Sequence, residues 1–131
     1  MQEAFRLKTR ESQEVVDITR QVAEVVARAR RDEGICTVFV RHATAAIIIN
    51  ENADAGFRQD VVTALDRLLP QGIWEHDKVD DNGAAHLKAT LLGPSELVPI
   101  RGGRLLLGTW QCIALVECDG PREREIVVDI R

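Results

Sequence analysis

Two of the three histidines in the chain, His76 and His86, lie in one polar stretch between Trp74 and Ser95. Between these histidines come, in chain order, Asp77, Asp80, Asp81 and Asn82. Metal sites and acid/base sites both need neutral imidazoles and ionised carboxylates that converge from a short range. This stretch supplies both kinds of group. The alternative interpretation is a solvated acidic loop whose histidines are incidental.

A second group of polar residues follows an apolar run, AAIII, at residues 45–49. Asn50, Glu51 and Asn52 come directly after this run. A strand that ends in polar side chains must satisfy them by turn and helix-cap bonds or with a ligand. If a ligand is bound, Glu51 is the candidate general base and Asp81 the second catalytic carboxylate. Asn50 and Asn52 are then candidate substrate ligands.

All three histidines, His42, His76 and His86, lie beside polar residues. Two neutral imidazoles with a carboxylate or a third imidazole would form a coordination shell for zinc or a similar divalent ion. The spacing contains neither an HxH nor an HExxH motif, so polar chemistry without a metal stays open as the alternative. His86 is also a candidate catalytic residue.

Length and charge limit the classes of protein to which the chain can belong. Its 131 residues correspond to one domain, residues 1–131. A net charge of -4 argues against a basic nucleic-acid-binding surface. The sequence has no apolar run long enough to span a membrane and no signal peptide, so we expect a cytoplasmic protein. Cys36, Cys112 and Cys118 lie in apolar runs without CxxC spacing and are expected to be buried thiols.

The elements that must position these residues follow from the apolar periodicity. We expect strands at residues 4–9, 14–18, 35–41, 45–51, 96–100, 105–107, 109–117 and 125–131, and helices at 20–33, 54–69 and 83–92. Thr19 and Asp54 are the expected N-caps of the first two helices, and Gly34 is expected to end the first. Strands joined mostly as hairpins favour an α+β fold with antiparallel sheets.

The helix expected at residues 83–92 presents two kinds of face. Leu87 and Leu91 are four residues apart and would face inward, whereas Asn82 and His86 share the same spacing on another face. Two polar side chains on one helix face, close to the helix N-terminus, form a sensible arrangement for a binding site.

Three motifs together resemble the YjbQ family, an uncharacterised protein family. The run HATAAIIINENAD, from His42 to Asp54, resembles its HTTAAxxINENAD segment. DNGAAHLKATLLGPS, from Asp81 to Ser95, resembles its DDNAxAHxKAxLLGPS segment. The segment from Ser95 to Gln111, which ends in Gly108-Thr109-Trp110-Gln111, resembles its C-terminal signature ending in GTWQ. The chain departs from the pattern at Ala43, where a hydroxyl residue is usual, and at Cys112, where small or apolar residues are usual.

The resemblance implies an α+β domain with two packed antiparallel sheets, a β-sandwich with about three helices, that assembles as a homotrimer. It also implies activity as a secondary thiamine-phosphate synthase, considered a side reaction in the family. That reaction joins hydroxymethylpyrimidine diphosphate to hydroxyethylthiazole phosphate and releases pyrophosphate.

A diphosphate substrate needs a divalent ion, zinc or magnesium, or basic groups. The candidate ligands for this small phosphorylated metabolite also include Asn82, Lys88, Thr109 and Gln111. Two alternatives stay open: a non-enzymatic protein that binds a metal or a phosphorylated metabolite, and a metal-dependent phosphoester hydrolase with Glu51 or Asp81 as base.

Overall fold

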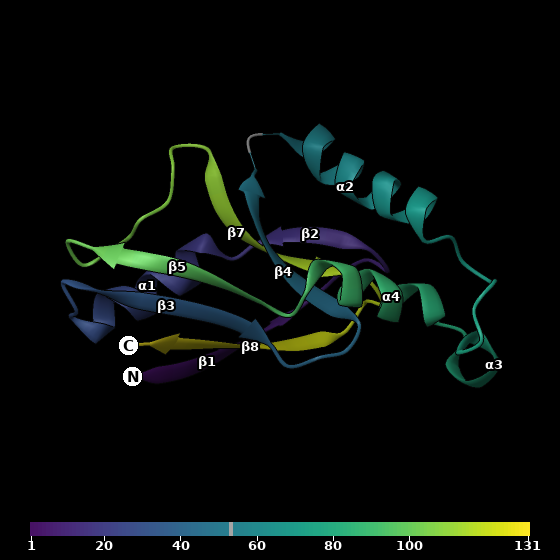
Figure 1. The fold of residues 1–131 in the computed structure, drawn as a ribbon, viewed down its shortest axis with the longest axis horizontal. Helices are drawn as coiled ribbons and strands as arrows, with labels where there is room; N and C mark the ends of the chain where they lie inside the picture. The colour runs from purple at the N-terminus through teal and green to yellow at the C-terminus, as the bar shows by residue number, and fades with distance from the viewer. Residues whose placement is uncertain (53) are drawn as a thin grey trace.

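A computed structural model describes residues 1–52 and 54–131. In this part of the chain, eight strands and four helices follow one another (Figure 1). They are β1 (Gln2–Lys8), β2 (Glu14–Asp17), α1 (Thr19–Ala29), β3 (Glu33–Val40), β4 (Ala45–Glu51), α2 (Ala55–Leu68), α3 (Asp77–Asp80), α4 (Gly83–Leu92), β5 (Ser95–Arg101), β6 (Arg104–Leu105), β7 (Gln111–Glu117) and β8 (Glu123–Ile130).

The strands form two sheets in which all pairs are antiparallel. The larger sheet has the order β1-β8-β3-β5-β6, and the smaller has the order β2-β7-β4. Because β1 pairs with β8, the two ends of the chain lie side by side (Figure 1). This arrangement confirms the predicted α+β fold with two antiparallel sheets.

The main hydrophobic core fills the space between the two sheets and the inner face of α1. Alternate residues of β3 and β8 face it, with Val38 and Val128 fully buried. Val22 of α1 and Leu115 of β7 complete it from the other side. Each fully buried aliphatic side chain of this kind contributes roughly 1.5–3 kcal/mol through the hydrophobic effect.

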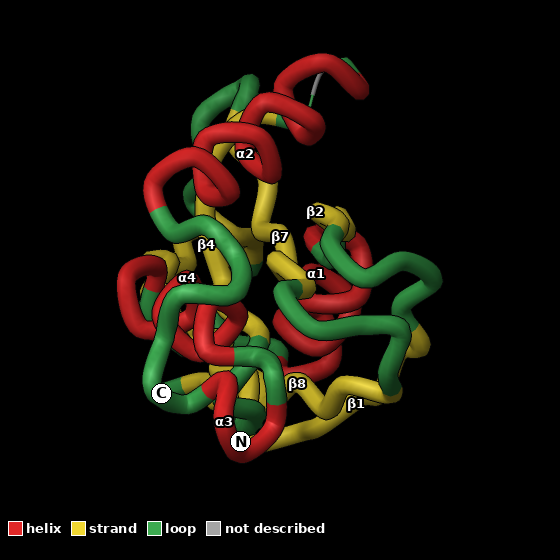
Figure 2. Tube along the Cα trace, turned by 90° about the vertical axis from the view of Figure 1, so that its right-hand side faces the viewer, coloured by secondary structure: helices red, strands yellow, loops and turns green. Residues whose placement is uncertain are grey.

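The opposite face of the smaller sheet is covered by helices. Ala46 and Val116 of that sheet pack with Leu65 of α2 and Ala85 of α4 in a second apolar cluster. Figure 2 shows this end of the molecule, with α2, α3 and α4 toward the viewer. Strand β4 is therefore covered on both faces, as its run of isoleucines predicts.

The first helix is shorter than its periodicity predicts. It ends at Ala29, where Arg30 adopts the left-handed conformation with φ 51°, and not at residue 33. Gly34 is therefore not the helix stop but part of β3. A Cβ at this position would lie 2.5 Å from the carbonyl oxygen of Arg131, so glycine permits this close strand pairing.

The capping residues agree with expectation in one helix and differ in another. Asp54 caps α2, because its side chain accepts a hydrogen bond from the Phe57 N–H at 2.7 Å. Thr19 is not a cap but the first residue of α1, and its N–H donates to the Asp17 carboxylate at 2.8 Å. The four-residue helix α3 is too short for sequence periodicity to reveal.

Two further expectations concern the whole chain. Cys36, Cys112 and Cys118 are buried free thiols, as predicted. Within residues 1–52 and 54–131, no helix is long and apolar enough to cross a membrane.

One charged side chain of α4 lies in the interior. Lys88 is 0% exposed, and its ammonium donates to Gln13 Oε1 at 2.7 Å and to Asp66 Oδ1 at 2.5 Å. Burial alone would raise the pKa of Asp66, but hydrogen bonds from Lys88 and Gln13 bring it below its ordinary value. The pair thus ties α4 to α2.

We predict that Asp66→Asn lowers the free energy of unfolding at pH 7 by about 1–3 kcal/mol, because it leaves the Lys88 ammonium buried without a countercharge. The loss is smaller than for a fully buried pair, since the Asp66 side chain is 43% exposed. The folded protein lowers the pKa of Asp66. Its contribution is therefore complete above the ordinary carboxyl pKa of about 3.9 and is lost as the pH falls through the lower folded value.

Urea unfolding at pH 7 and pH 3 measures this effect. The exposed Asp60→Asn on the same helix serves as the matched control. The ion pair would be ruled out as the cause if the Asp66→Asn deficit were the same at both pH values.

Candidate functional site

An open cavity of about 630 Å³ lies where the β3–β4 connection, the α3–α4 corner and the β7–β8 connection meet. Its lining residues are His42, Ala43, Thr44, Asp80, Asp81, Asn82, His86, Asp119, Arg122 and Arg124. The cavity brings together four of the residues predicted from the sequence: His42 from the first motif, and Asp81, Asn82 and His86 from the second. All four come from one chain.

His42 follows the end of β3 and is held by the backbone of β8. Its Nε2 atom accepts a hydrogen bond from the Glu125 N–H at 3.0 Å. Burial and the neighbouring Arg124 guanidinium lower the pKa of His42 below its ordinary value. The imidazole is therefore neutral at pH 7 and carries its proton on Nδ1.

The corner between α3 and α4 positions the polar face of α4. Asp77 accepts hydrogen bonds from the Trp74 N–H at 3.0 Å and from the Gly83 N–H at 2.8 Å. These two backbone hydrogen bonds lower the pKa of Asp77. Asp81 adopts the left-handed conformation with φ 55°, which aspartate tolerates better than most residues. The turn between the helices is thus fixed at both ends.

Asn82, at the start of α4, is only partly satisfied. Its Nδ2 donates to Asp119 Oδ2 at 2.9 Å, whereas its Oδ1 is buried without a hydrogen-bond donor in the described structure. An unsatisfied buried acceptor costs about 1–3 kcal/mol, and such atoms are uncommon in native proteins. A ligand or water that donates a hydrogen bond here would remove that cost.

His86 lies one turn further along α4 and contacts the third histidine. The His76 and His86 rings meet edge to face, with centroids 4.5 Å apart. His76 Nε2 lies 3.5 Å from Asp80 Oδ2, which is too long for a strong hydrogen bond. His86 lines the cavity, whereas His76 does not. Both histidines line a neighbouring recess.

The floor of the cavity is a buried ion pair that sequence analysis missed. Arg124 of β8 is 2% exposed, and its Nε donates to Glu117 Oε2 at 2.9 Å. Its Nη2 donates to Glu117 Oε1 and to Thr44 Oγ1, the latter at 2.8 Å. Thr9 also donates to Glu117, at 2.8 Å. These bonds compensate the cost of burying two charges.

The charged groups at the mouth of the cavity have both signs. Asp119 accepts a second hydrogen bond at Oδ2, from Arg122 Nη2 at 3.0 Å. Three aspartates and two arginines line the cavity, so the carboxylates outnumber the guanidinium groups. Such a site does not favour a bare anion. It favours a ligand that carries amino or cationic groups, or an anion whose charge is partly neutralised.

The expected shell of three histidines does not fit this geometry. The lone pair on His42 Nε2 already accepts the Glu125 N–H, so it is not free to coordinate a metal. Across the described parts of the chain, no group of three or more His, Cys, Asp and Glu side chains is arranged to hold a metal ion.

The other predicted site residues lie elsewhere. Lys88 does not line the cavity, because its ammonium is held by Gln13 and Asp66. Those that remain, Asn50, Glu51, Asn52, Thr109 and Gln111, are at the far end of β4 and at the start of β7. Seven residues of extended strand separate this end from the cavity, a distance of about 20 Å.

Several of these far-end side chains have local partners. Asn50 Oδ1 accepts the Glu51 N–H at 2.8 Å, and Gln111 Oε1 accepts the Gly108 N–H at 2.8 Å. Asn52 donates to Asp17 at 2.7 Å. The bonds of Asn50 and Asn52 agree with the alternative in which the polar residues at the end of β4 are satisfied within the chain.

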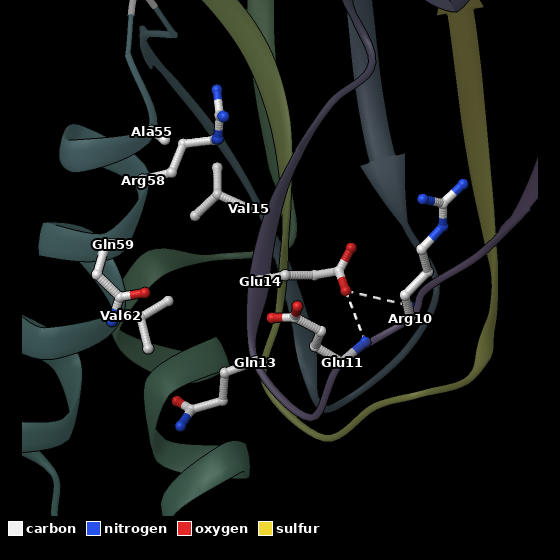
Figure 3. A pocket seen from close by; sticks show the side chains of 9 residues that line it. All are labelled: Arg10, Glu11, Gln13, Glu14, Val15, Ala55, Arg58, Gln59 and Val62. Carbon is white, nitrogen blue, oxygen red and sulfur yellow. Dashed lines mark hydrogen bonds between the residues drawn. The ribbon is translucent and has the colours of Figure 1, made fainter.

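A second hollow, of about 390 Å³, lies between β2 and α2 (Figure 3). The Glu14 carboxylate inside it accepts hydrogen bonds from the backbone N–H groups of Arg10 and Glu11, at 3.0 and 2.6 Å (Figure 3). This hollow contains none of the residues predicted from the sequence. The cavity at His42 and His86 is therefore the candidate functional site.

Comparison with known proteins agrees with this fold and these motifs. The family profile described as UPF0047 protein YjbQ-like matches residues 3–131. The chain belongs to the YjbQ/UPF0047 family, whose function is unknown.

Relatives from archaea and bacteria match over almost their full length. A UPF0047 protein of Methanocaldococcus jannaschii is 40% identical over 126 residues, which cover 96% of this chain and 91% of the relative. The UPF0047 protein YugU of Bacillus subtilis is 39% identical over 127 residues, covering 95% and 94%.

A solved structure shares the fold closely. The crystal structure of a YbjQ-like protein of unknown function from Sulfolobus solfataricus is 44% identical and superposes with a TM-score of 0.96. The match covers 99% of this chain and 95% of that chain.

We predict that His42 titrates below the ordinary histidine pKa of about 6.5, because its burial and Arg124 disfavour the imidazolium form. His42 therefore stabilises the fold fully above about pH 6.5, and this contribution is lost as the pH falls toward its folded pKa. Histidine-detected NMR across pH 4–8 measures the pKa and the tautomer. A proton on Nε2 at pH 7, or a pKa above 6.5, would contradict the hydrogen bond to Glu125.

Proposed function

We propose that the cavity is the active site of a transferase resembling thiamine-phosphate synthase, which joins hydroxymethylpyrimidine diphosphate and hydroxyethylthiazole phosphate. The observation that carries the proposal is the convergence of Asp81, Asn82, His86 and two arginines in one cavity. The carboxylates of this lining complement the amino groups of a small phosphorylated metabolite, and its guanidinium groups complement the phosphates.

The reaction needs no covalent bond to the protein. The lone pair of the thiazole nitrogen forms a bond to the pyrimidine methylene carbon, and the bond from that carbon to the diphosphate oxygen breaks. The diphosphate leaves with the electron pair, and the ring nitrogen becomes cationic. Because no proton must be removed from this nitrogen, the reaction needs no general base.

The cavity residues can act on both charges that develop. Asp81 and Asp119 stabilise the positive charge that grows on the pyrimidine portion. Arg122 and the Nδ1–H of His42 are the donors for the leaving diphosphate. Arg124 holds the floor rigid beneath them.

The expected divalent ion fits as magnesium better than as zinc. Magnesium is commonly held by one or two carboxylates and the substrate's own phosphates, which does not require a cage of three protein ligands. Asp80 is the carboxylate that would hold it. When bound, the ion would offset the negative charge of the diphosphate, which suits a cavity lined by three aspartates and two arginines.

We predict that Asp81→Asn lowers the rate of pyrophosphate release from the two substrates by roughly tenfold to a hundredfold, because a preorganised charge facing the reacting carbon is lost. Thermal unfolding should change little, since Asp81 is exposed. The matched control, Asp60→Asn, removes an exposed carboxylate of α2 and should retain the wild-type rate.

The same assay tests the alternatives. Pyrophosphate release that requires only the pyrimidine substrate would indicate a hydrolase, and ligand binding without turnover would indicate a binding protein. Wild-type rates in Asp81→Asn and His86→Ala would overturn the proposed active site.

We further propose a homotrimer, as the family resemblance implies. The outer face of the larger sheet exposes apolar side chains that a single chain leaves uncovered: Ile35 is 43% exposed, Phe39 40% and Leu97 62%. Trp110, before β7, is 70% exposed. Association of chains would remove such surface from water.

Light scattering coupled to size exclusion should therefore give a mass three times that of the 14.6 kDa chain. The mass should hold on dilution, because the exposed apolar side chains favour association through the hydrophobic effect. A mass equal to one chain would contradict the trimer and would leave the cavity as a single-chain site.

A further inference from the structure

Another recess, which we call the apolar slot, adjoins the polar cavity on the other side of His86. It is distinct from the hollow between β2 and α2. It has a volume of about 440 Å³ and is lined by Trp74, Glu75, His76, Gly83, His86 and Leu87. His86 is the residue that the two linings share, so its imidazole stands at the boundary between them. Its lining residues lie directly before α3 and in the first turns of α4, two helices that face the viewer in Figure 2.

The walls of the slot are held in place before any ligand arrives. The indole Nε1 of Trp74 donates to the Pro70 carbonyl oxygen at 2.7 Å, which fixes the orientation of the ring. Asp77 joins the Trp74 and Gly83 backbones through two hydrogen bonds. Trp74 and Gly83 pack so closely that a Cβ on Gly83 would lie 2.6 Å from the Trp74 Cβ.

The character of this lining differs from that of the cavity. The cavity is lined by carboxylates, guanidinium groups and an amide, whereas an indole, two imidazoles and a leucine dominate the slot. Aromatic and aliphatic walls favour a flat apolar ring over a charged group. The two recesses together therefore match a ligand with a polar, phosphorylated end and an aromatic end.

We infer that Trp74 and Leu87 are specificity-determining residues, which receive the aromatic ring of the ligand whose phosphorylated end occupies the cavity. This inference rests on the proposed function, since it needs the cavity to bind the phosphorylated end. His86 stands between the ring and the polar end of the same ligand. The slot selects ligands by the ring, and the cavity selects them by charge.

The test uses two stable probes that differ only by a phenyl ring, methylphosphonate and benzylphosphonate. Their binding to the full chain is measured by calorimetry in buffer containing magnesium. Burial of the ring should make benzylphosphonate bind roughly tenfold more tightly than methylphosphonate. Leu87→Ser should remove most of this advantage and leave methylphosphonate binding unchanged. Leu91→Ser, a change of the same kind on α4 outside the slot, should keep the advantage.

Each outcome separates the two proposals. Equal binding of both probes to the wild-type protein would overturn the role of the slot and leave the proposed function standing. An advantage that survives in folded Leu87→Ser, with folding checked by circular dichroism, would also overturn it. Failure of both probes to bind would overturn the anion-binding role of the cavity and, with it, the inference that depends on it.

Discussion

The buried ion pair between Arg124 and Glu117 is the interaction on which the site depends. Arg124 belongs to the larger sheet and Glu117 to the smaller one, so the pair links the two sheets at the end where the cavity opens. From two other segments, Thr9 donates a hydrogen bond to Glu117 and Thr44 accepts one from Arg124. Loss of one partner of such a pair typically costs about 3–5 kcal/mol, because the other charge stays buried. The fold and the cavity floor are therefore built from the same contacts.

Close packing beside this pair places the groups at the cavity mouth. A Cβ on Gly120 would lie 2.2 Å from the Glu11 carbonyl oxygen and 2.8 Å from Glu117 Cγ, so only glycine fits there. The tight turn carries Asp119 toward Asn82, which is bonded to it at 2.9 Å. The α4 face and the β7–β8 connection are thereby fixed relative to each other, as preorganised sites require.

Local periodicity in the sequence predicted most elements. The motifs singled out His42, Asn82 and His86 as candidate site residues, and the fold of one chain brings these three to one cavity. The sequence did not predict the roles of Arg124 or Lys88, since their partners lie on other elements. A signal for Arg124 exists nonetheless. Arg124, Ile126 and later alternate residues of β8 share the core-facing side, but the strand was predicted to begin one residue after Arg124. A charge in a core-facing position indicates a buried pair.

The position of Glu51 at the far end of β4 decides whether it can act as a base in the cavity. Within one chain, the extended strand keeps Glu51 about 20 Å from His42, and a β-strand paired along its length does not bend to close that distance. The candidate base of the sequence analysis is thus remote from the cavity of its own chain. Glu51 can act in the same reaction only if another chain places it there. The transfer reaction proposed for the cavity needs no such base, so the cavity of one chain contains the groups that this chemistry requires.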